Sequence, residues 1–276
     1  MQSADDMSSG EEVQLKGEAC SGAGSLSRKG APWSVEEHCA FLKGLEKLGK
    51  GSCLDDSCLA SLAPLGRSLT RLSLTAFTTS LASQEAAQGL AALPHLTSLE
   101  LQSAAALTDT GLAVLCHSPC APQLCHLALQ HTSAGLVTEH GLQLLAATCT
   151  SLTTLNLSYC GSAVSDAVLL QLASSVPRLK ELQCSLAGGV TDAGLVALLR
   201  CPQLDLLDLS YCQGITGRVT SLTSLRLARC PELTDVGVAA LSRLVRLSTL
   251  SLAHCNITEV GLLALSPLTA LASMEF

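Results

Sequence analysis

The chain has 276 residues, of which 48% are hydrophobic and only 2% aromatic, and its formal net charge is −7. A negative net charge disfavours a broad nucleic-acid-binding surface, and a core so poor in rings has to be built from Leu, Ala and Val. The acidic start lacks a basic and then apolar signal, and no apolar run approaches the ~20 residues that span a bilayer. We therefore expect no membrane segment and an intracellular protein, cytoplasmic or nuclear, whose 14 cysteines are reduced thiols.

Residues 1–30 are rich in Ser, Gly and acidic side chains and contain almost no large apolar ones. Such a segment cannot bury enough surface to offset the entropy lost on ordering. We therefore expect a disordered tail over residues 1–30.

Residues 31–51 predict one amphipathic helix. Ser34 is a favourable N-cap, and Glu37, three residues later, completes a capping box. Apolar residues then recur at helical spacing until two glycines end the pattern, at Phe41, Leu42, Leu45, Leu48, Gly49 and Gly51.

This helix resembles the first helix of the plant single-repeat MYB-related proteins. The residues that carry the resemblance are Trp33-Ser34, Glu36-Glu37-His38, Phe41-Leu42, Gly44-Leu45 and Leu48-Gly49-Lys50-Gly51. In that family a Trp packs among three helices, and the third helix reads the DNA major groove. Trp33 is the only tryptophan here, and the S-H-A-Q-K-Y stretch of the reading helix is absent. We therefore expect a partial MYB-like helix over 31–51 without sequence-specific DNA binding; the alternative is a transcription-related DNA-binding protein that uses this segment.

The chain from residue 52 onward is organised by a repeated phrase, L-x-x-L-x-L-x-x-C. The middle leucine, replaced by Met274 in the last copy, recurs in steps of 24 to 28 residues with one exception. A period of this size is typical of a solenoid, in which each unit buries its apolar face against its neighbours. The nine copies begin at Leu69, Leu96, Leu124, Leu152, Leu179, Leu204, Leu222, Leu247 and Leu271.

A second phrase stands between the leucine phrases, as in Thr191-Asp192-Ala193-Gly194-Leu195. Its hydroxyl caps the amides of a new helix, and its carboxylate favours the positive end of the helix dipole. Each repeat is therefore predicted to be a strand, a turn and an amphipathic helix. We predict an α/β right-handed solenoid, or horseshoe, of about nine repeats over 52–276, with a parallel sheet on the concave face and helices on the convex face.

The two phrases together resemble the cysteine-containing class of leucine-rich repeats, as found in F-box proteins that choose substrates for ubiquitin ligases. The resemblance covers Leu54 to Phe276 and implies the horseshoe fold. It also implies a protein-binding scaffold, with a substrate-recognition adaptor for ubiquitin ligation as its most specific form. We identify no F-box before the repeats, so an adaptor role requires a substitute for it.

One repeat is short. Cys212 is 13 residues before Leu225, whereas Cys230 is 20 residues before Leu250, so seven residues, about two helical turns, are missing. We expect the helix of this repeat to be lost or reduced to a turn, and its neighbours to expose apolar helix surface. The feature is either a partner groove on the convex side or a tolerated deletion.

The last strand is predicted at Met274-Glu275-Phe276, with no polar capping unit after it. Terminal repeats need a polar cap, and an uncovered strand edge pairs readily with another chain. We expect this edge to be covered by a further segment, by a partner or by self-association.

Candidate catalytic and metal-binding groups are few. The spacing in the densest cluster does not match a zinc knuckle; the cluster consists of Cys116, His117, Cys120, Cys125 and His126. The cysteines of the leucine phrase recur at the turn after each strand, where a small buried side chain suits a tight bend. We find no phosphate-binding loop and no pairing of a nucleophile with His, and we expect no catalytic site, metal or cofactor.

The partner-binding surface is predicted from strand geometry. The leucines face the core, so alternate residues face the opposite, concave side of the sheet. Interface energy concentrates in Tyr, Trp and Arg, and the only two tyrosines stand just beyond two of the strands. We expect a protein partner on this face, the alternative being a merely solvated polar surface. The candidate residues are Arg71, Glu100, His126, Asn156, Tyr159, Glu181, Asp208, Tyr211 and Arg226.

Overall fold

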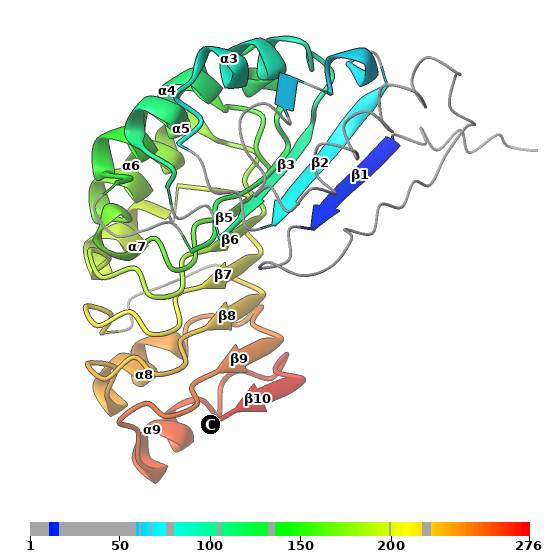
Figure 1. Ribbon diagram of the computed structural model, residues 1–276. Coiled ribbons are helices and arrows are strands. Elements are labelled where there is room, and N and C mark those ends of the chain that lie inside the picture. Colours follow the sequence, from blue (N-terminus) through cyan, green and yellow to red (C-terminus); the bar gives the residue numbers. More distant parts are fainter. Residues whose placement is uncertain are drawn as a thin grey trace, which may run out of the picture.

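The computed structural model describes residues 11–16, 59–60, 62–66, 68–75, 80–103, 106–131, 136–198, 200–216 and 222–276. They form a curved array in which strands run side by side along one face and helices cover the other (Figure 1). This is the predicted α/β horseshoe. The expected helix over residues 31–51 lies outside the described residues. In the part of the chain that the structure describes, no helix is long and apolar enough to cross a bilayer.

The described strands form one parallel sheet, in which each strand pairs with its neighbours in chain order. The register places the middle leucines of successive phrases opposite each other, as with Leu127, Leu155 and Leu182. The leucine phrase therefore sets the register as well as the position of each strand. The strands are β1 (Glu11–Lys16), β2 (Leu69–Thr75), β3 (Ser98–Gln102), β4 (His126–Ala128), β5 (Thr154–Asn156), β6 (Glu181–Gln183), β7 (Leu206–Asp208), β8 (Ser224–Arg226), β9 (Thr249–Ser251) and β10 (Ser273–Glu275).

Strand β1 lies in the segment for which the sequence predicts a disordered tail. It pairs in parallel with β2, with Val13 opposite Leu72 and Leu15 opposite Leu74. Its sequence, E-E-V-Q-L-K, alternates polar and apolar residues with the period of a strand, and it covers an edge of β2 that would otherwise be unpaired. For these six residues the structure differs from the expected disorder; the rest of 1–30 lies outside the described residues.

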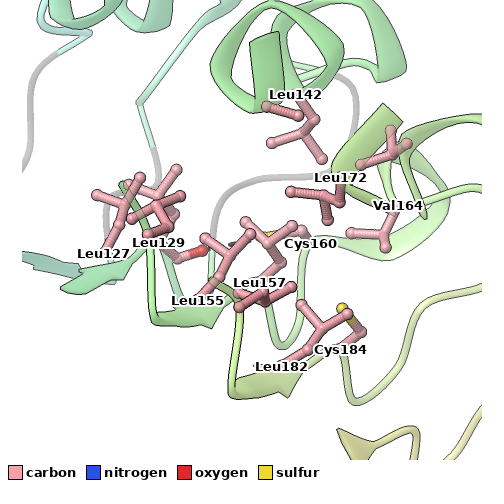
Figure 2. Close-up of a cluster of buried hydrophobic side chains, with 14 of the residues drawn as sticks. Leu127, Leu129, Leu142, Leu155, Leu157, Cys160, Val164, Leu172, Leu182 and Cys184 are labelled. Atoms are coloured by element: carbon pink, nitrogen blue, oxygen red, sulfur yellow. Dashed lines mark hydrogen bonds between the residues drawn. The ribbon is translucent and has the colours of Figure 1, made fainter. Parts of the chain in front are cut away.

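The core is a stack of leucine layers, one layer for each repeat. Leu155 and Leu157 are fully buried and cluster with Leu127 and Leu129 of the preceding repeat and Leu182 of the following one (Figure 2). Leu142 and Leu172 close the layer from the helical side (Figure 2). Because every layer touches the next, no repeat buries its leucines alone.

The cysteine of the leucine phrase ties each turn to the repeat before it. The Cys160 thiol donates to the carbonyl oxygen of Leu129 across 3.0 Å (Figure 2). Cys230 and Cys255 make the same bond to the preceding repeat, at 3.2 and 2.9 Å. Alanine at these positions would leave the carbonyl without this donor.

The helices begin where the second phrase predicts them. Thr108, for example, accepts a hydrogen bond from the Gly111 amide at 3.2 Å, as an N-cap should. Three short 3-10 turns, Ala63–Leu65, Ala121–Gln123 and Gly161–Ala163, complete the described helical structure. The helices are α3 (Gln84–Ala91), α4 (Asp109–Cys116), α5 (Glu139–Thr148), α6 (Asp166–Ser175), α7 (Asp192–Leu198), α8 (Asp235–Leu241) and α9 (Glu259–Ala264).

The first acidic residue of a helix also holds the N-cap of the next repeat. The Asp166 carboxylate accepts the backbone amide and the hydroxyl of Thr191 at 2.8 and 2.6 Å. Asp235 binds Thr258 in the same way, also at 2.8 and 2.6 Å. We call this contact the Asp–Thr link. Gly194 lets the two helices approach this closely, because a Cβ atom there would collide with Asp166.

The short repeat lacks a helix in its described residues, in agreement with the sequence prediction. The chain passes from β7 to β8 through residues 209–216 and 222–223 without one. Thr216 still makes the link to Asp192, and its carbonyl oxygen lies against Gly237 of α8. Val236 of α8 is 83% exposed, but Val260, its equivalent in α9, is also 69% exposed. This apolar exposure therefore belongs to the position in the helix and does not result from the missing helix.

We predict that Leu155→Ala lowers the free energy of unfolding by roughly 2–5 kcal/mol, because it leaves a cavity between two packed repeats. Chemical denaturation of the full chain measures the loss. The matched control is Leu263→Ala, since Leu263 is exposed on α9, and it should change stability by less than about 0.5 kcal/mol. Equal effects of the two substitutions would contradict the layered core.

We predict that the Asp–Thr link makes stability depend on pH. Hydrogen bonds from the hydroxyl and amide of Thr258 lower the pKa of Asp235. A folded-state pKa below the unfolded one stabilises the fold above the ordinary Asp pKa of about 3.9, and this gain is lost as the pH falls through the folded value. Asp235→Asn should therefore lower the Tm at neutral pH, with a difference from the unaltered chain that shrinks in acid. Thermal melts over a pH series test this, with Glu232→Gln as the control; a pH-independent difference would contradict it.

Candidate functional site

The candidate site is the face of the sheet opposite the leucines. In β3, for example, the leucines are buried and the residues between them are partly exposed, as the sequence predicts. Parallel pairing aligns these alternate residues into two rows that cross the strands. The first row contains Arg71, Ser98, His126, Thr154, Glu181, Leu206, Ser224 and Thr249. The second row contains Ser73, Glu100, Ala128, Asn156, Gln183, Asp208, Arg226 and Ser251.

Seven of the nine sequence-predicted residues stand in these rows, and the two tyrosines lie beyond the strand ends. The structure brings two pairs of them into contact, Glu100 with His126 and Asp208 with Arg226. Neither pairing was part of the sequence prediction, because each depends on the register between two strands. Glu100 and His126 are 26 residues apart in the sequence, and Asp208 and Arg226 are 18 residues apart.

The first pair lines a polar hollow near the N-terminal end of the sheet. Glu100 Oε1 lies 3.3 Å from His126 Nε2, and its Oε2 accepts a hydrogen bond from Ser73 at 3.0 Å. The hydrogen bond with His126, and then that with Ser73, lower the pKa of Glu100 against the opposing effect of burial. With Arg71 and Cys125 these residues line a hollow of about 360 Å³. Its size and polarity suit one charged or polar side chain of a partner.

The second pair leaves a cation exposed. Arg226 Nη1 lies 4.0 Å from Asp208 Oδ2, and the side chain of Arg226 is 52% exposed whereas that of Asp208 is 15% exposed. Asp208 also accepts the backbone amide of Ser210 at 3.0 Å, so this carboxylate is engaged within its own repeat. Arg226 is therefore the group of this pair that a partner can reach.

Asn156 serves the fold more than the surface. It is buried; its Oδ1 accepts the Ser158 amide at 2.9 Å, and its Nδ2 donates to Gln183 at 2.6 Å. Asn156 occupies the predicted row, but its amide group is already used within the sheet. Gln183, its neighbour on β6 in the same row, shares this contact.

A further row stands just past the strand ends, and the sequence analysis found only its two tyrosines. All its members are non-glycine residues with a φ between 56° and 64°, a left-handed conformation that costs roughly 1–2 kcal/mol for a residue with a Cβ. Several of them directly precede the phrase cysteine, a position that the sequence could have revealed. We call it the rim row: Ser103, His131, Tyr159, Leu186, Tyr211, Arg229 and His254.

Burial makes the described cysteines of the leucine phrase poor candidates for nucleophiles. Burial raises the pKa of Cys212 to about 11 and that of Cys230 to about 12, which keeps both protonated at neutral pH. A hydrogen bond with Cys149 lowers the pKa of Cys116 to about 7, but the Cys116 thiol is buried. Cys125 is exposed, whereas Cys120 is buried. In the described ranges, no group of three or more His, Cys, Asp or Glu residues could hold a metal ion.

Comparison with solved structures finds chains of low sequence identity. The chain is 21% identical to an internalin (InlF) of Listeria monocytogenes, covering 81% of this chain and 71% of that one with a TM-score of 0.47. It is 20% identical to internalin C2 of the same organism, covering 79% and 82% with a TM-score of 0.49. It is 18% identical to a chain of the yeast Rad7–Elc1 complex, covering 86% and 75% with a TM-score of 0.43.

Among curated proteins, the rice (Oryza sativa subsp. japonica) transcription factor MYBS1 is 57% identical to this chain over 35 residues. The aligned segment is 13% of this chain and spans only 11% of the length of that transcription factor. The match is therefore a likeness to a short piece of that protein.

The model of the family described as Leucine Rich repeat matches four stretches, residues 92–116, 148–161, 220–242 and 247–266. The first contains β3 and α4, the third β8 and α8, and the fourth β9 and α9, so each of these three covers one strand-and-helix unit. Matched repeats, a parallel sheet in chain order and a helix after most strands lead to one conclusion: the chain contains leucine-rich repeats and folds as a leucine-rich-repeat solenoid.

Proposed function

We propose that this protein is a non-catalytic protein–protein interaction scaffold that binds a protein partner on the concave face of its sheet. The observation that supports it best is the pair of side-chain rows, which stand at strand spacing on one continuous sheet face. Leucine-rich repeats support protein–protein interaction in general, because stacked repeats present an extended curved surface. Two side-chain pairs of the described residues, Glu100–His126 and Asp208–Arg226, lie on the concave face.

The chemistry of this face favours a partner of mixed charge. Arg226 is exposed at one end, and the Glu100–His126 pair borders a hollow near the other. Alternating charges of both signs fix the register of a partner and disfavour uniformly charged ligands. Arginine is also one of the side chains in which interface energy concentrates, so Arg226 is the strongest anchor within the two rows.

A narrower form of the proposal is a substrate-recognition adaptor for ubiquitin ligation. It rests on the resemblance of the double phrase to the repeats of F-box proteins. In that role the concave face would hold the substrate, and a second surface would have to contact the ligase. The setting we propose is cytoplasmic or nuclear, where buried thiols such as Cys160 stay reduced.

Self-association through β10 is a further part of the proposal. β10 pairs with β9, and the side chains of Met274 and Phe276 are 38% and 73% exposed. An apolar strand edge of this kind pairs readily with an added strand. Light scattering at increasing protein concentration measures whether a second copy supplies it.

We predict that a concave-face variant with Arg71→Ala, Glu181→Ala and Arg226→Ala captures its partner at least roughly tenfold less well, since it removes side chains from both rows. The measurement is affinity capture with the full chain from a cell extract, quantified by mass spectrometry. Circular dichroism and thermal melts first establish that the variant is folded.

The matched control is a helix-side variant with Arg200→Ala, Glu232→Ala and Arg243→Ala. It removes the same charges from exposed positions next to α7 and α8. We expect it to capture the partner normally. If the helix-side variant alone loses the partner, the concave-face proposal is wrong.

The alternative function is transcription-related DNA binding through the MYB-like segment. The observation that favours it is the 57% identity to MYBS1 over 35 residues. The argument against it is the absence from this sequence of the S-H-A-Q-K-Y stretch that resembling proteins carry in their reading helix.

We predict that the full chain selects no defined sequence from a random pool of duplex DNA at physiological salt. Lys43, Lys47 and Lys50 should give only weak retention that disappears as salt rises, because phosphate contacts release counterions. Selection followed by sequencing measures this. Enrichment of one motif, lost on Trp33→Ala, would favour the transcription-related function instead.

A further inference from the structure

The rim row is held in place by a backbone ladder that continues past the strands. The amide of each rim residue donates to the carbonyl that precedes the rim residue of the next repeat. Tyr159 binds Ser185 at 2.8 Å, Leu186 binds Ser210 at 2.9 Å, and Tyr211 binds Ala228 at 2.6 Å. His131 and Arg229 extend the ladder on either side, at 3.2 and 2.8 Å to Ser158 and Ala253. The left-handed conformation is thus imposed by neighbouring repeats, and rim side chains follow each other at about the strand spacing of 4.8 Å.

This spacing brings the rim side chains into contact with one another. The His131 and Tyr159 rings stack with centroids 4.1 Å apart and planes 17° apart. At the other end, the guanidinium carbon of Arg229 lies 5.6 Å from the centroid of the Tyr211 ring. Leu186 stands between the two tyrosines in the ladder. Five consecutive repeats therefore contribute to one ridge.

The ridge is exposed and borders a row of small side chains. Tyr159, Leu186 and Tyr211 are 42%, 40% and 42% exposed. The residues just before them, Ser158, Ser185 and Ser210, are buried and too small to rise above the sheet. The small buried serines therefore lie beside the larger exposed side chains of the ridge, in a row that crosses the strands.

The charges differ along the ridge. Arg229 and Arg226 of one repeat stand at its C-terminal end, and both are exposed. Glu181 lies in the first row, toward the middle of the ridge. Among the described residues, a ligand lying along the ridge therefore meets two arginines at its C-terminal end. The acidic side chains and the net charge of −7 disfavour a nucleic acid as this ligand.

We propose that the rim row binds an extended segment of the protein partner, with proline or aliphatic side chains over Tyr159, Leu186 and Tyr211 and a carboxylate at Arg229. The inference rests on the proposed scaffold function and names the part of the partner that is recognised. Tyrosine rings offer flat apolar faces with a hydroxyl at the edge, which suit proline-rich extended peptides. Four strand intervals span roughly 19 Å, the length of about six extended residues.

The test starts from a random dodecapeptide phage library selected on the full chain. Peptides that emerge are synthesised with a fluorescent label, and their Kd is measured by anisotropy. We expect a shared pattern of proline or aliphatic residues with an Asp or Glu on one side. Tyr159→Asn with Tyr211→Asn should weaken binding by roughly tenfold or more. Asn tolerates a positive φ better than other residues with a Cβ, so this variant should fold with an unchanged or higher Tm.

A charge exchange makes the test directional. On an Arg229→Glu variant, the selected peptide should bind more weakly, and the same peptide with its acidic residue replaced by Lys should bind more tightly than it does to the unaltered chain. A peptide that ignores Arg229→Glu and both tyrosine substitutions would overturn the proposal.

The concave-face and helix-side variants separate the two proposals. If the peptides bind the tyrosine variant normally but do not bind the concave-face variant, the rim-row proposal is wrong and the scaffold function still stands. Peptides lost only on the helix-side variant contradict both. Failure to enrich any peptide family, or binding of an oligo-dT strand that the tyrosine substitutions abolish, also overturns a peptide site at the rim row.

Discussion

The stacking of leucine layers is the constraint on which the structure depends. A single strand, turn and short helix cannot bury the leucines of one phrase, so each repeat is stable only between neighbours. Burial of Leu155 between Leu127 and Leu182 sets the strand register, and the register aligns the side chains on the opposite face. The same register carries the backbone ladder that forces the rim row into a left-handed conformation. The core and the proposed binding surface thus depend on the same strand register.

The repeated phrases predicted the strands, the helix starts and the two concave rows, because those features depend on spacing within a repeat. Features that depend on contacts between repeats were less accessible. The Glu100–His126 and Asp208–Arg226 pairs require knowing which residues of different strands lie side by side. Asn156 was predicted to be a surface residue, yet neighbouring polar groups draw its amide into the sheet. Strand β1 was missed because E-E-V-Q-L-K is too short and polar to stand out until β2 offers it an edge.

The rim row combines an unfavourable backbone conformation with a proposed role in binding. Tyr159, Leu186 and Tyr211 are poor choices for a positive φ, which glycine or asparagine adopts at less cost. The structure accommodates them because adjoining repeats over-determine the backbone at this position. Strained non-glycine residues that persist in this way cluster at binding sites. The proposed peptide site would use the large exposed side chains at these positions, each of which costs roughly 1–2 kcal/mol in backbone conformation.

The lack of a helix in the described part of the short repeat affects how the solenoid unfolds. In a solenoid, stability is approximately a sum of intrinsic repeat terms and nearest-neighbour coupling terms. At the short repeat the sheet is continuous between β7 and β8, but residues 209–216 and 222–223, the described part of this connection, contain no helix. The side chain of Thr234 makes no capping hydrogen bond to α8. Coupling between the described residues there is carried by the strands, the core leucines and the contacts of Thr216 with Asp192 and Gly237. We expect the β8–β10 repeats to unfold locally as one unit before the rest of the solenoid. Arg226 and Arg229 would then lie at the boundary between a more stable and a less stable part of the same surface.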